Sequence, residues 1–543
     1  MAWAARRAAR AAVVAALLAA LPGACTARHG GAAQTPVRGG TLRVADSAEV
    51  DSLDSRAARS RLAWTLERAT TRELYSFDPA ARGDRAALPV PDLAEGQPLV
   101  GADGRTWRFR LRPGGRFGPP LARDVTAADF VAAFRPGNRF NPYLGLFQAA
   151  LALDPRTLEL RLARPLPELR SILALPLFAP VPAEDATRPP GRGKAVASGP
   201  YQVARWRPGS SLTLVRNPDW RPATDPLRHA WVDRIEVSAG LDQAEVQRRL
   251  EDGEADLSLD GAAPRGRDLP GIVADRRLAG RWALKTTGCA WQLELDTRAG
   301  PTARLGVRRA VAYALDKYAV LRAFGGPYGG LPGTTILPPS VAGFQPADRY
   351  ATTGAHGDVD RARRLLAAAG FPAGVTLAAA APAVGDAPAA LAGLAGSLAR
   401  AGIRLRTDLL PGPADAPGIP AAGRPPGGVL LLRRCPAWPG DAAYSLLVAG
   451  FGGQRPAPSA PTDPTGYVNP QVDRLIDAAL AEPDPTSRAH RWAAVDARVL
   501  DDAPVVPLTV EEAASLWSAR LRGWTWTPWL ANPDLTAAWL PPP

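Results

Sequence analysis

Cysteine, histidine and methionine are scarce in this chain of 543 residues, which holds three Cys, four His and one Met. The four histidines, His29, His229, His356 and His490, stand far apart, and none belongs to an HExxH motif. A metal site would need ligands grouped at short spacings. We therefore expect neither a metal nor another cofactor.

Short motifs that mark catalytic or nucleotide-binding sites are missing as well. The chain has no GxSxG or SxxK motif to present a nucleophile, and no GxxxxGK[ST] or GxGxxG motif to cradle phosphates. Asp501 and Asp502 are neighbours in sequence, so on a helix their side chains would diverge by about 100° instead of forming an acid/base pair. The sequence predicts a protein that is not an enzyme, with an exported hydrolase as a remote alternative.

Charge of one sign is nowhere concentrated, although the net charge is +13. Removal of an N-terminal leader that contains Arg6, Arg7 and Arg10 would leave a net charge of +10. No run of five or more Lys/Arg occurs, and acidic residues are interspersed. This distribution argues against a nucleic-acid partner. The composition is that of a globular protein, and the length exceeds that of a single hydrophobic core.

The first 24 residues read as an export signal, with arginines before an apolar run at residues 11–21 and small residues before Cys25. That run is shorter than the roughly 20 residues of a membrane span, so we expect a soluble mature chain. The sequence LPGAC at residues 21–25 resembles a bacterial lipoprotein processing site, except that Pro22 stands where such sites usually have Leu. We predict lipidation of Cys25 at the outer face of the cytoplasmic membrane and a flexible tether over residues 25–38, with plain cleavage near Ala24 as the alternative.

The remaining two cysteines are Cys289 and Cys435. In an exported protein, an isolated pair of cysteines favours a disulfide over a metal pair, because a metal would require further ligands nearby. We therefore expect a Cys289–Cys435 bridge.

Strand-like and helix-like hydrophobic patterns alternate along the chain and predict an α/β fold. The strand, helix and strand from Arg234 to Leu257 predict a βαβ unit and hence a partly parallel sheet. Helices are predicted after the N-cap Thr126 and over residues 242–250, 305–324, 359–369 and 472–481, and a long surface loop over residues 411–428. Further strands are predicted at residues 39–44, 103–111, 158–162, 198–203 and 211–215.

Tryptophan is abundant, with 15 copies, and several of them lie near turn residues. Indole faces and N–H groups suit the walls of a cleft that holds an organic ligand. Packing in a core or between lobes is the alternative interpretation of each one. The tryptophans concerned are Trp206, Trp220, Trp291, Trp438, Trp524 and Trp526.

Distinctive segments follow one another along nearly the whole mature chain. They are GGTLRV at residues 39–44, DLAE at 92–95, DGRTWRFRLR at 103–112, VTAADF at 125–130, SGPY at 198–201, LVRNP at 214–218, VRRAVAYALD at 307–316, YVNPQVDRLID at 467–477 and DAPVVPL at 502–508. In these segments and in their order, the chain resembles the extracytoplasmic solute-binding proteins of family 5. This peptide/nickel class includes the oligopeptide- and dipeptide-binding lipoproteins of ABC importers.

The resemblance implies a periplasmic-binding-protein-like α/β fold, with two lobes built from three domains, a ligand cleft between the lobes and a hinge of two crossover segments. A ligand would contact both lobes only in the closed state and would thereby stabilise that state. The implied division is a signal peptide at residues 1–24, the tether at 25–38, domain I at 39–80, 192–280 and 500–543, domain II at 81–191 and domain III at 281–499. Domains I and II would form the first lobe and domain III the second.

Peptide-binding members of this family carry an Asp, in a W/C-x-D-[YW]-P segment, that pairs with the free amino group of the ligand. In the similar segment at residues 435–441 the acidic place is Ala437. Unless Asp441 reaches into the cleft, an ammonium end would stay unpaired at a cost of roughly several kcal/mol, which argues against ordinary free-amino peptides. The ligand-contact positions we predict are Trp291, on the strand that opens domain III, and Trp438, Asp441 and Tyr444.

We therefore expect a monomeric, membrane-tethered solute-binding protein that delivers a peptide or peptide-like ligand to the permease of an ABC-type importer. The alternative is a degenerate protein of the same fold that acts in the cell envelope or in signalling and no longer transports. Ala437 and the Pro/Gly-rich loop before it motivate that alternative.

Overall fold

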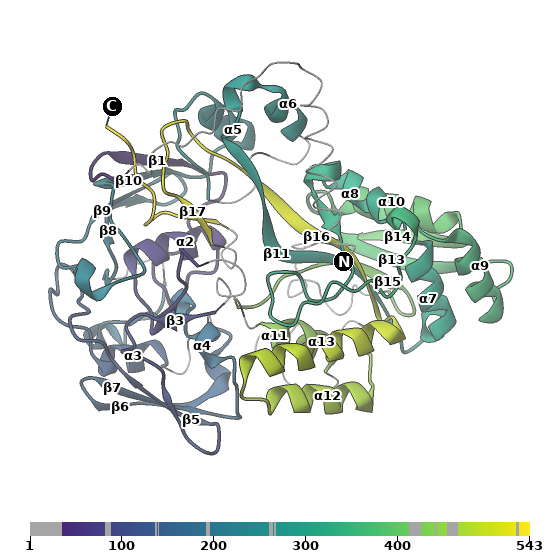
Figure 1. Ribbon diagram of the computed structural model, residues 1–543, viewed down its shortest axis with the longest axis horizontal. Coiled ribbons are helices and arrows are strands. Elements are labelled where there is room, and N and C mark those ends of the chain that lie inside the picture. Colours follow the sequence, from purple (N-terminus) through teal and green to yellow (C-terminus); the bar gives the residue numbers. More distant parts are fainter. Residues whose placement is uncertain are drawn as a thin grey trace, which may run out of the picture.

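The computed structural model describes residues 35–81, 88–135, 138, 141–191, 196–259, 264, 268–411, 425–438, 440, 442–452, 465–527 and 532–542. Cys25 and Asp441, two of the predicted functional residues, lie outside these ranges. The described chain forms two lobes joined near the centre (Figure 1). We call the part with the two four-stranded sheets lobe 1 and the part with the six-stranded sheet lobe 2. The predicted α/β class is confirmed.

The first sheet of lobe 1 has the strand order β1-β10-β9-β8, in which β1 and β10 are parallel and the other neighbours antiparallel. Its inner face carries Leu42, Leu214 and Ile235, and helix α2 (Arg61–Thr70) packs Leu62 against them in one hydrophobic core. The strands are β1 (Thr41–Ala45), β8 (Tyr201–Arg207), β9 (Ser211–Arg216) and β10 (Arg234–Ser238).

The second sheet of lobe 1 is antiparallel, with the order β4-β5-β7-β6. Trp107 and Phe109 point into its core, as the alternating pattern predicts. Helix α3 (Ala127–Ala133) begins at the predicted N-cap, where the Thr126 backbone N–H donates a hydrogen bond of 2.8 Å to the Asp129 carboxylate. The other elements are β4 (Leu99–Val100), β5 (Thr106–Arg110), β6 (Phe147–Asp154), β7 (Thr157–Leu162) and α4 (Leu169–Ile172).

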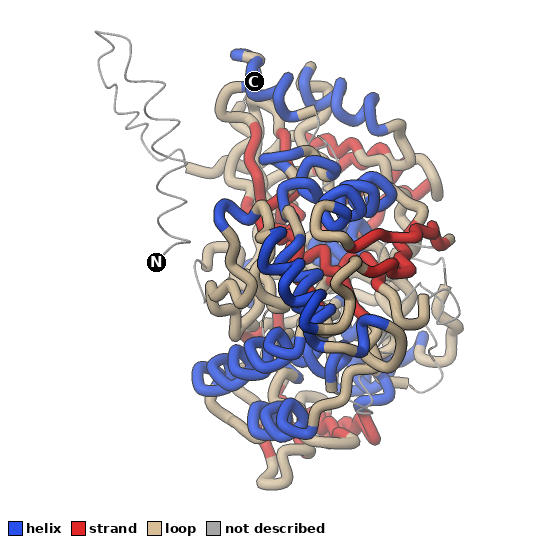
Figure 2. The backbone as a smooth tube through the Cα atoms, turned by 90° about the vertical axis from the view of Figure 1, so that its right-hand side faces the viewer, coloured by secondary structure: helices blue, strands red, loops and turns tan. Residues whose placement is uncertain are grey.

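Lobe 2 is built on a mixed sheet with the order β12-β16-β11-β15-β13-β14. Helices α7 to α10 share one core with this sheet, and α11 to α13 pack in a second core. Figure 2, which faces this side of the molecule, shows helices in front of the strands. The strands are β11 (Trp282–Leu295), β12 (Gly330–Pro332), β13 (Val375–Pro382), β14 (Ile403–Leu410), β15 (Val429–Arg434) and β16 (Val505–Leu516). The helices are α7 (Leu305–Ala314), α8 (Lys317–Ala323), α9 (Val359–Ala368), α10 (Ala387–Ala399), α11 (Ala443–Phe451), α12 (Pro470–Leu480) and α13 (Pro485–Asp502).

The single helix predicted over residues 305–324 is wrong, because the structure has two helices there, α7 and α8. Leu315 is extended, and the Asp316 carboxylate accepts hydrogen bonds from the N–H groups of Tyr318 and Ala319 at 3.0 and 3.3 Å. This cap satisfies N–H groups that a new helix start leaves without partners. Hydrophobic residues keep their helical spacing across the break, so the sequence pattern does not reveal it.

The predicted βαβ unit is present in reduced form. Strand β10 leads into α5 (Gln243–Glu251), which begins after its predicted N-cap Asp242. The returning strand, expected at residues 255–257, is only a parallel bridge between Leu257 and Val44. The remaining short elements are β2 (Tyr75–Ser76), β3 (Val90–Pro91), α6 (Leu269–Ala274), β17 (Thr525–Thr527) and β18 (Asn532–Asp534).

The low-complexity stretch before β15 contains regular structure. Its first part forms α10 and the edge strand β14, which pairs in parallel with β13. Most of the predicted loop at residues 411–428 lies outside the described ranges. Within those ranges, no helix combines the length and the apolar character that crossing a bilayer requires.

Candidate functional site

Two long strands, β11 and β16, connect lobe 1 with lobe 2 (Figure 1). They pair antiparallel along most of their length. At one end Trp282 and Leu516 pack with α5 of lobe 1, and at the other end Leu293 and Val506 belong to the core of lobe 2. A paired ribbon that enters both cores is therefore the covalent connection between the lobes.

The ribbon is irregular where it passes between the lobes. Its pairing register breaks over residues 286–290, and Gly288 has a φ of +77°, a conformation that favours glycine. Cys289 follows, and its sulfur is joined to that of Cys435, just after β15, with the two Cα atoms 4.2 Å apart. From lobe 1, the Arg61 guanidinium at the start of α2 lies 3.9 Å from the Cys289 sulfur. This junction therefore combines the connecting ribbon, β15 and lobe 1.

Beside the disulfide, the carboxylate of Glu511 on β16 accepts hydrogen bonds from two neighbours. The Thr287 hydroxyl donates at 2.6 Å and the Arg433 guanidinium at 2.7 Å. Burial disfavours the charged form, but Arg433, Thr287 and the more distant Arg61 outweigh burial and hold the pKa of Glu511 below its usual value. An ionised carboxylate thus ties the connecting ribbon to β15 at the boundary of the lobes.

The segment after β15 contacts lobe 1 directly. The Tyr143 hydroxyl of lobe 1 donates a hydrogen bond of 2.6 Å to the backbone oxygen of Ala437, and its ring meets Trp438 edge-on with 6.0 Å between centroids. Trp438 stacks on Tyr444 at 5.9 Å, and the Arg164 guanidinium of lobe 1 lies 5.6 Å from the centre of the Tyr444 ring. The lobes therefore touch through aromatic side chains.

This contact excludes water from both partners. Trp438 and Tyr444 are 2% and 1% exposed, and one cluster of buried side chains runs from Phe178 in lobe 1 to Trp492 in lobe 2. Burial raises the pKa of Tyr143, so its hydroxyl stays protonated and remains a donor. The structure thus records the lobes in a packed arrangement.

Two of the four predicted ligand-contact residues, Trp438 and Tyr444, lie together at the contact between the lobes. Trp291 lies elsewhere, in the core of lobe 2, where it stacks on Phe324 with 4.8 Å between centroids. Asp441 lies outside the described ranges. Sequence reasoning missed Arg61, Tyr143, Arg164, Arg433 and Glu511, which belong to no motif and come together only through the fold.

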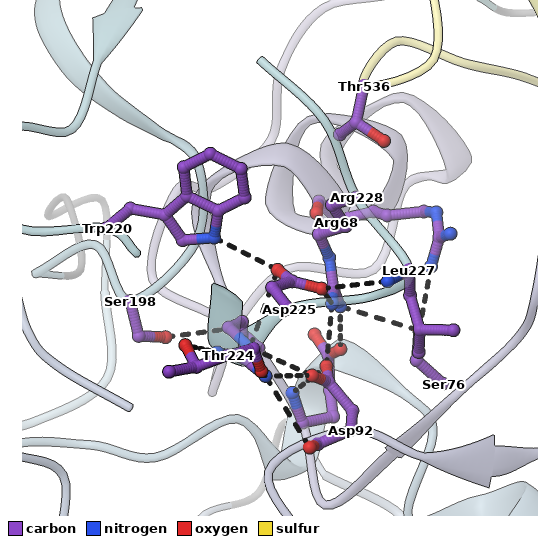
Figure 3. Close-up of polar contacts among 12 residues, drawn as sticks. Arg68, Ser76, Asp92, Ser198, Trp220, Thr224, Asp225, Leu227, Arg228 and Thr536 are labelled. Carbon is purple, nitrogen blue, oxygen red and sulfur yellow. Dashed lines mark hydrogen bonds and ion pairs between the residues drawn. The ribbon is translucent and has the colours of Figure 1, made fainter. Parts of the chain in front are cut away.

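A second polar constellation lies inside lobe 1 (Figure 3). Asp92 receives charge-assisted hydrogen bonds of 2.8 Å from Arg72 and 2.7 Å from Arg228, and Asp225 lies 3.4 Å from Arg228. Glu73 accepts from Arg228 at 2.9 Å. All five of these side chains are 3% exposed or less. They join the segment after α2, the segment after β3 and the loop after β9 into one rigid unit.

Within this cluster, the pKa values of Asp92 and Glu73 are shifted in opposite directions. Burial alone would raise the pKa of Asp92, yet Arg228 and Arg72 overcome it and keep the pKa below its usual value. Burial raises the pKa of Glu73 to about 7, because Arg228 offsets it only in part. The arginines also donate hydrogen bonds to backbone oxygens and hydroxyl groups, as expected where charged side chains hold segments of the chain together. We therefore assign this cluster a role in stabilising lobe 1.

A surface groove of about 670 Å³ lies between α3 and β6. Its walls include Val131, Phe134, Leu144 and Phe147, and all of its lining residues belong to lobe 1. No described residue of lobe 2 is among the residues that line this groove. Among the described residues, no group of three or more His, Cys, Asp and Glu side chains is arranged to hold a metal ion.

Comparisons with known sequences identify relatives over most of the chain. The chain is 26% identical over 456 residues to the glutathione-binding protein GsiB of Salmonella typhi, covering 79% of this chain and 82% of that protein. It is 25% identical over 436 residues to the glutathione-binding protein GsiB of Escherichia coli O1:K1 / APEC, covering 78% and 81%.

Solved structures resemble this one over nearly their full length. The clavulanic acid biosynthesis oligopeptide binding protein 2 superposes with a TM-score of 0.84 at 31% identity, covering 94% of this chain and 96% of that chain. The murein tripeptide binding protein MppA in its unliganded open form gives 0.73 at 18% identity, covering 93% and 98%. The protein AgaA of A. tumefaciens R10, in complex with agropinic acid, gives 0.68 at 21% identity, covering 93% and 99%. The latter two establish the fold alone.

The predicted periplasmic-binding-protein-like architecture is thereby confirmed, and it is the fold of substrate-binding proteins, not of enzymes. The family model for bacterial extracellular solute-binding proteins, family 5 (middle region), matches residues 89–419, which is more than half of the chain. The chain therefore belongs to family 5 of the bacterial extracellular solute-binding proteins.

Proposed function

We propose that this protein captures a peptide or peptide-like solute between its two lobes outside the cytoplasm and delivers it to the permease of an ABC-type importer. The observation that carries the proposal is the contact of Tyr143 with the Ala437 backbone and the Trp438 ring, which joins the lobes at a place apart from the connecting ribbon of β11 and β16. A ligand that bridges the two lobes stabilises the closed state by its extra contacts there. No bond is made or broken in this role.

The named ligands of similar proteins support a small, polar, peptide-like solute. Two of these proteins are named for glutathione and a murein tripeptide, and a third holds agropinic acid. Trp438 and Tyr444 supply apolar faces for such a molecule, and Arg61 and Arg433 flank the same boundary with guanidinium groups. We include Asp441 among the ligand contacts and assign Trp291 a supporting place in lobe 2.

The ligand we propose does not use a carboxylate at position 437 to hold a free amino group. Ala437 offers only its backbone there, and its oxygen already accepts the Tyr143 hydrogen bond. An ammonium group buried without a partner loses roughly several kcal/mol relative to water. A peptide-like solute whose amino group is absent, blocked or held elsewhere fits this position better than an ordinary free-amino peptide.

The cell-envelope setting is part of the same proposal. We propose a monomer that is exported, anchored by lipid on Cys25 and stabilised by the Cys289–Cys435 disulfide. The proposed domain limits are domain I at residues 39–80, 192–280 and 500–543, domain II at 81–191 and domain III at 281–499. Measurement of the intact mass of the exported protein tests the anchor. Lipidation of Cys25 adds the mass of the acyl chains, and processing at this site removes the residues before Cys25.

Equilibrium binding tests the proposed function. The processed protein is titrated with glutathione, agropinic acid and matched di- and tripeptides with free or acetylated amino ends, and its melting temperature is recorded with each. A true ligand at a hundred times its Kd stabilises the folded state by about 2.7 kcal/mol. Reconstituted uptake with the partner permease and ATPase then tests delivery. A broad panel without any stabilising compound would overturn the proposal.

A second candidate is a protein of this fold that no longer transports. The direct packing of Tyr143 on Trp438 favours it, because side chains of the protein occupy part of the boundary between the lobes. The same titrations separate the two candidates. A ligand that is bound but never taken up by the reconstituted importer would favour a role in the cell envelope or in signalling.

A further inference from the structure

The outer face of the first sheet of lobe 1 carries an excess of positive charge. Pairing register places Arg43, Glu236 and Arg205 in one row across β1, β10, β9 and β8. Arg234 lies in the next row on one side and Arg207 in the next row on the other. All five side chains are exposed, so four guanidinium groups share this face with one carboxylate. We call this set the basic sheet face.

The opposite face of the same sheet packs against the hydrophobic interior of lobe 1. Leu42, Ile235 and Leu214 alternate with the basic sheet face and pack against α2. Because successive residues of a strand point to opposite faces, the arginines cannot turn inward without exposing this core. The fold therefore holds the basic sheet face on the outside of the molecule.

Three carboxylates on or beside these strands are already paired with cations. Asp233, at the start of β10, pairs with Arg216 at 3.2 Å. Asp256 is fully buried and pairs with Arg520 at 2.7 Å. Within the face itself, Glu236 lies 3.7 Å from Arg234. Each of these carboxylates has its own cation, so the face keeps a net charge of about +3 at neutral pH.

The position of β1 in the chain brings this face near a membrane. Only two residues, Gly39 and Gly40, lie between Arg38, where the predicted tether ends, and the start of strand β1. The thirteen residues from Thr26 to Arg38 reach at most about 45 Å even when fully extended. A chain anchored at Cys25 therefore holds the start of the first sheet of lobe 1 within about this distance of the bilayer.

From charge and proximity together, we infer that the basic sheet face docks on the anionic phospholipid headgroups of the membrane that carries the protein. This inference rests on the proposed lipid anchor and goes beyond the proposed ligand binding. A basic residue held near an anionic surface strengthens binding about fivefold at low salt, and the effect is lost beyond a Debye length. Docking of this face would orient the lobes relative to the permease.

Sedimentation with vesicles tests the inference. The processed protein is mixed with phosphatidylcholine vesicles and with vesicles containing 30% phosphatidylglycerol, in 50 mM and 500 mM NaCl. The measured quantity is the ratio of binding to the two vesicle types, because an acyl anchor contributes equally to both. We expect a ratio of at least about ten in low salt, close to one in high salt.

Charge-matched variants assign the effect to this face. The face variant carries Arg43→Gln, Arg205→Gln, Arg207→Gln and Arg234→Gln, and the control carries Arg364→Gln, Arg404→Gln, Arg406→Gln and Arg474→Gln, four exposed arginines of lobe 2. The face variant should lose the preference for anionic vesicles, and the control should keep it. Glu236→Gln should increase the preference. Equal losses in both quadruple variants, or no preference in the unchanged protein, would overturn the inference.

Ligand titration of the same variants separates this inference from the proposed function. The basic sheet face lies on the side of the first sheet away from α2, whereas Tyr143 and Trp438 form the contact between the lobes. The face variant should therefore bind ligand as the unchanged protein does. A face variant that loses ligand binding together with vesicle binding would show that the arginines act through folding, which contradicts a membrane role.

Discussion

Tyr143 of lobe 1 donates a hydrogen bond of 2.6 Å to the backbone oxygen of Ala437 in lobe 2, across a separation of 294 residues. The contact lies beside the stacked rings of Trp438 and Tyr444. It joins the lobes at a position other than the β11 and β16 ribbon, so it acts on the opening and closing of the molecule and not on the cohesion of either lobe.

Removal of the Tyr143 hydroxyl should shift the molecule toward the open state. Tyr143→Phe loses one hydrogen bond worth about 1 kcal/mol, which reduces the closed population and weakens ligand binding about fivefold. Small-angle scattering should show a larger radius of gyration. The matched control is Tyr350→Phe, because the Tyr350 hydroxyl donates to the Leu500 carbonyl inside lobe 2. Equal changes in affinity for both variants would contradict a specific role in closure.

Restoring an acidic side chain at position 437 should change ligand preference. Ala437→Asp would supply a carboxylate for a ligand amino group, and a charge-assisted hydrogen bond contributes about 1.5–3 kcal/mol. We expect free-amino peptides to gain at least tenfold in affinity over their acetylated counterparts, measured by titration calorimetry. Asp441→Asn in the otherwise unchanged protein tests the other candidate carboxylate. If the unchanged protein already prefers free-amino peptides and loses this preference in Asp441→Asn, Asp441 is the anchor.

Loss of the Cys289–Cys435 bridge should lower stability. The bridge closes a loop with a sequence separation of 146 residues, and the chain-entropy model attributes about 4–5 kcal/mol to a loop of this length. Replacing both cysteines by Ser should therefore lower the melting temperature by several degrees, and reduction of the unchanged protein should do the same. Thiol titration under denaturing conditions is the control, since two additional thiols after reduction would identify the bond.

Breaking the buried charge cluster should be far more damaging than breaking an exposed one with the same number of carboxylates. Arg228→Ala removes the cation that pairs with Glu73 and leaves Asp92 and Asp225 with Arg72 alone, and removing one partner of a buried pair costs about 3–5 kcal/mol. Arg248, which pairs with Glu245, Asp252 and Glu254 on the surface, is the matched control. Arg248→Ala should scarcely change the midpoint of urea unfolding. Similar losses in both variants would contradict the importance of burial.

The buried carboxyl of Asp496 should make stability fall as pH rises. Burial raises its pKa from 3.8 to about 6, although the N–H groups of Ile336 and Leu337 donate to it at 3.2 and 2.9 Å. Between these two pKa values, the folded state still holds a proton that the unfolded state has released. The resulting contribution to the free energy of unfolding is therefore complete below about pH 4 and is lost as the pH rises through 6. The change amounts to about 3 kcal/mol.

Urea unfolding between pH 4 and 7 measures this effect. Asp496→Asn cannot titrate, so its stability should vary less across this range than that of the unchanged protein. Asp360→Asn, at an exposed carboxylate on α9, should preserve the original slope. Parallel curves for all three proteins would contradict the assignment.

Local patterns predicted much of the framework. The cap at Thr126, the placement of Trp107 and Phe109 on one face of β5, and the strands β8 and β9 each depend on interactions between residues that are close in sequence. The break at Asp316 was not predicted, because a capping carboxylate inside a continuous hydrophobic period gives the same pattern as a longer helix. The segment at residues 255–257 has a strand-like composition but pairs only at Leu257.

The predicted ligand-contact residues do not all lie together in the structure. Trp438 and Tyr444 were selected in and after the family-like segment at residues 435–441, and the structure brings them together at the contact between the lobes. Trp291 was selected on the strand that opens domain III, and its ring lies in the core of lobe 2 against Phe324. Which face of a strand a ring occupies depends on register with its neighbours, and a single strand does not encode that register.

By itself, the sequence determined the α/β class, the family and most helix and strand positions, because periodicity and caps act over a few residues and the family segments are long. Only the tertiary structure decided that Arg61 lies beside Cys289, that Tyr143 meets Ala437, and that the arginines of β1, β8 and β10 gather on one face. These partners are separated by tens to hundreds of residues. Their proximity comes from sheet register and from the packing of one lobe on the other, which are properties of the whole chain.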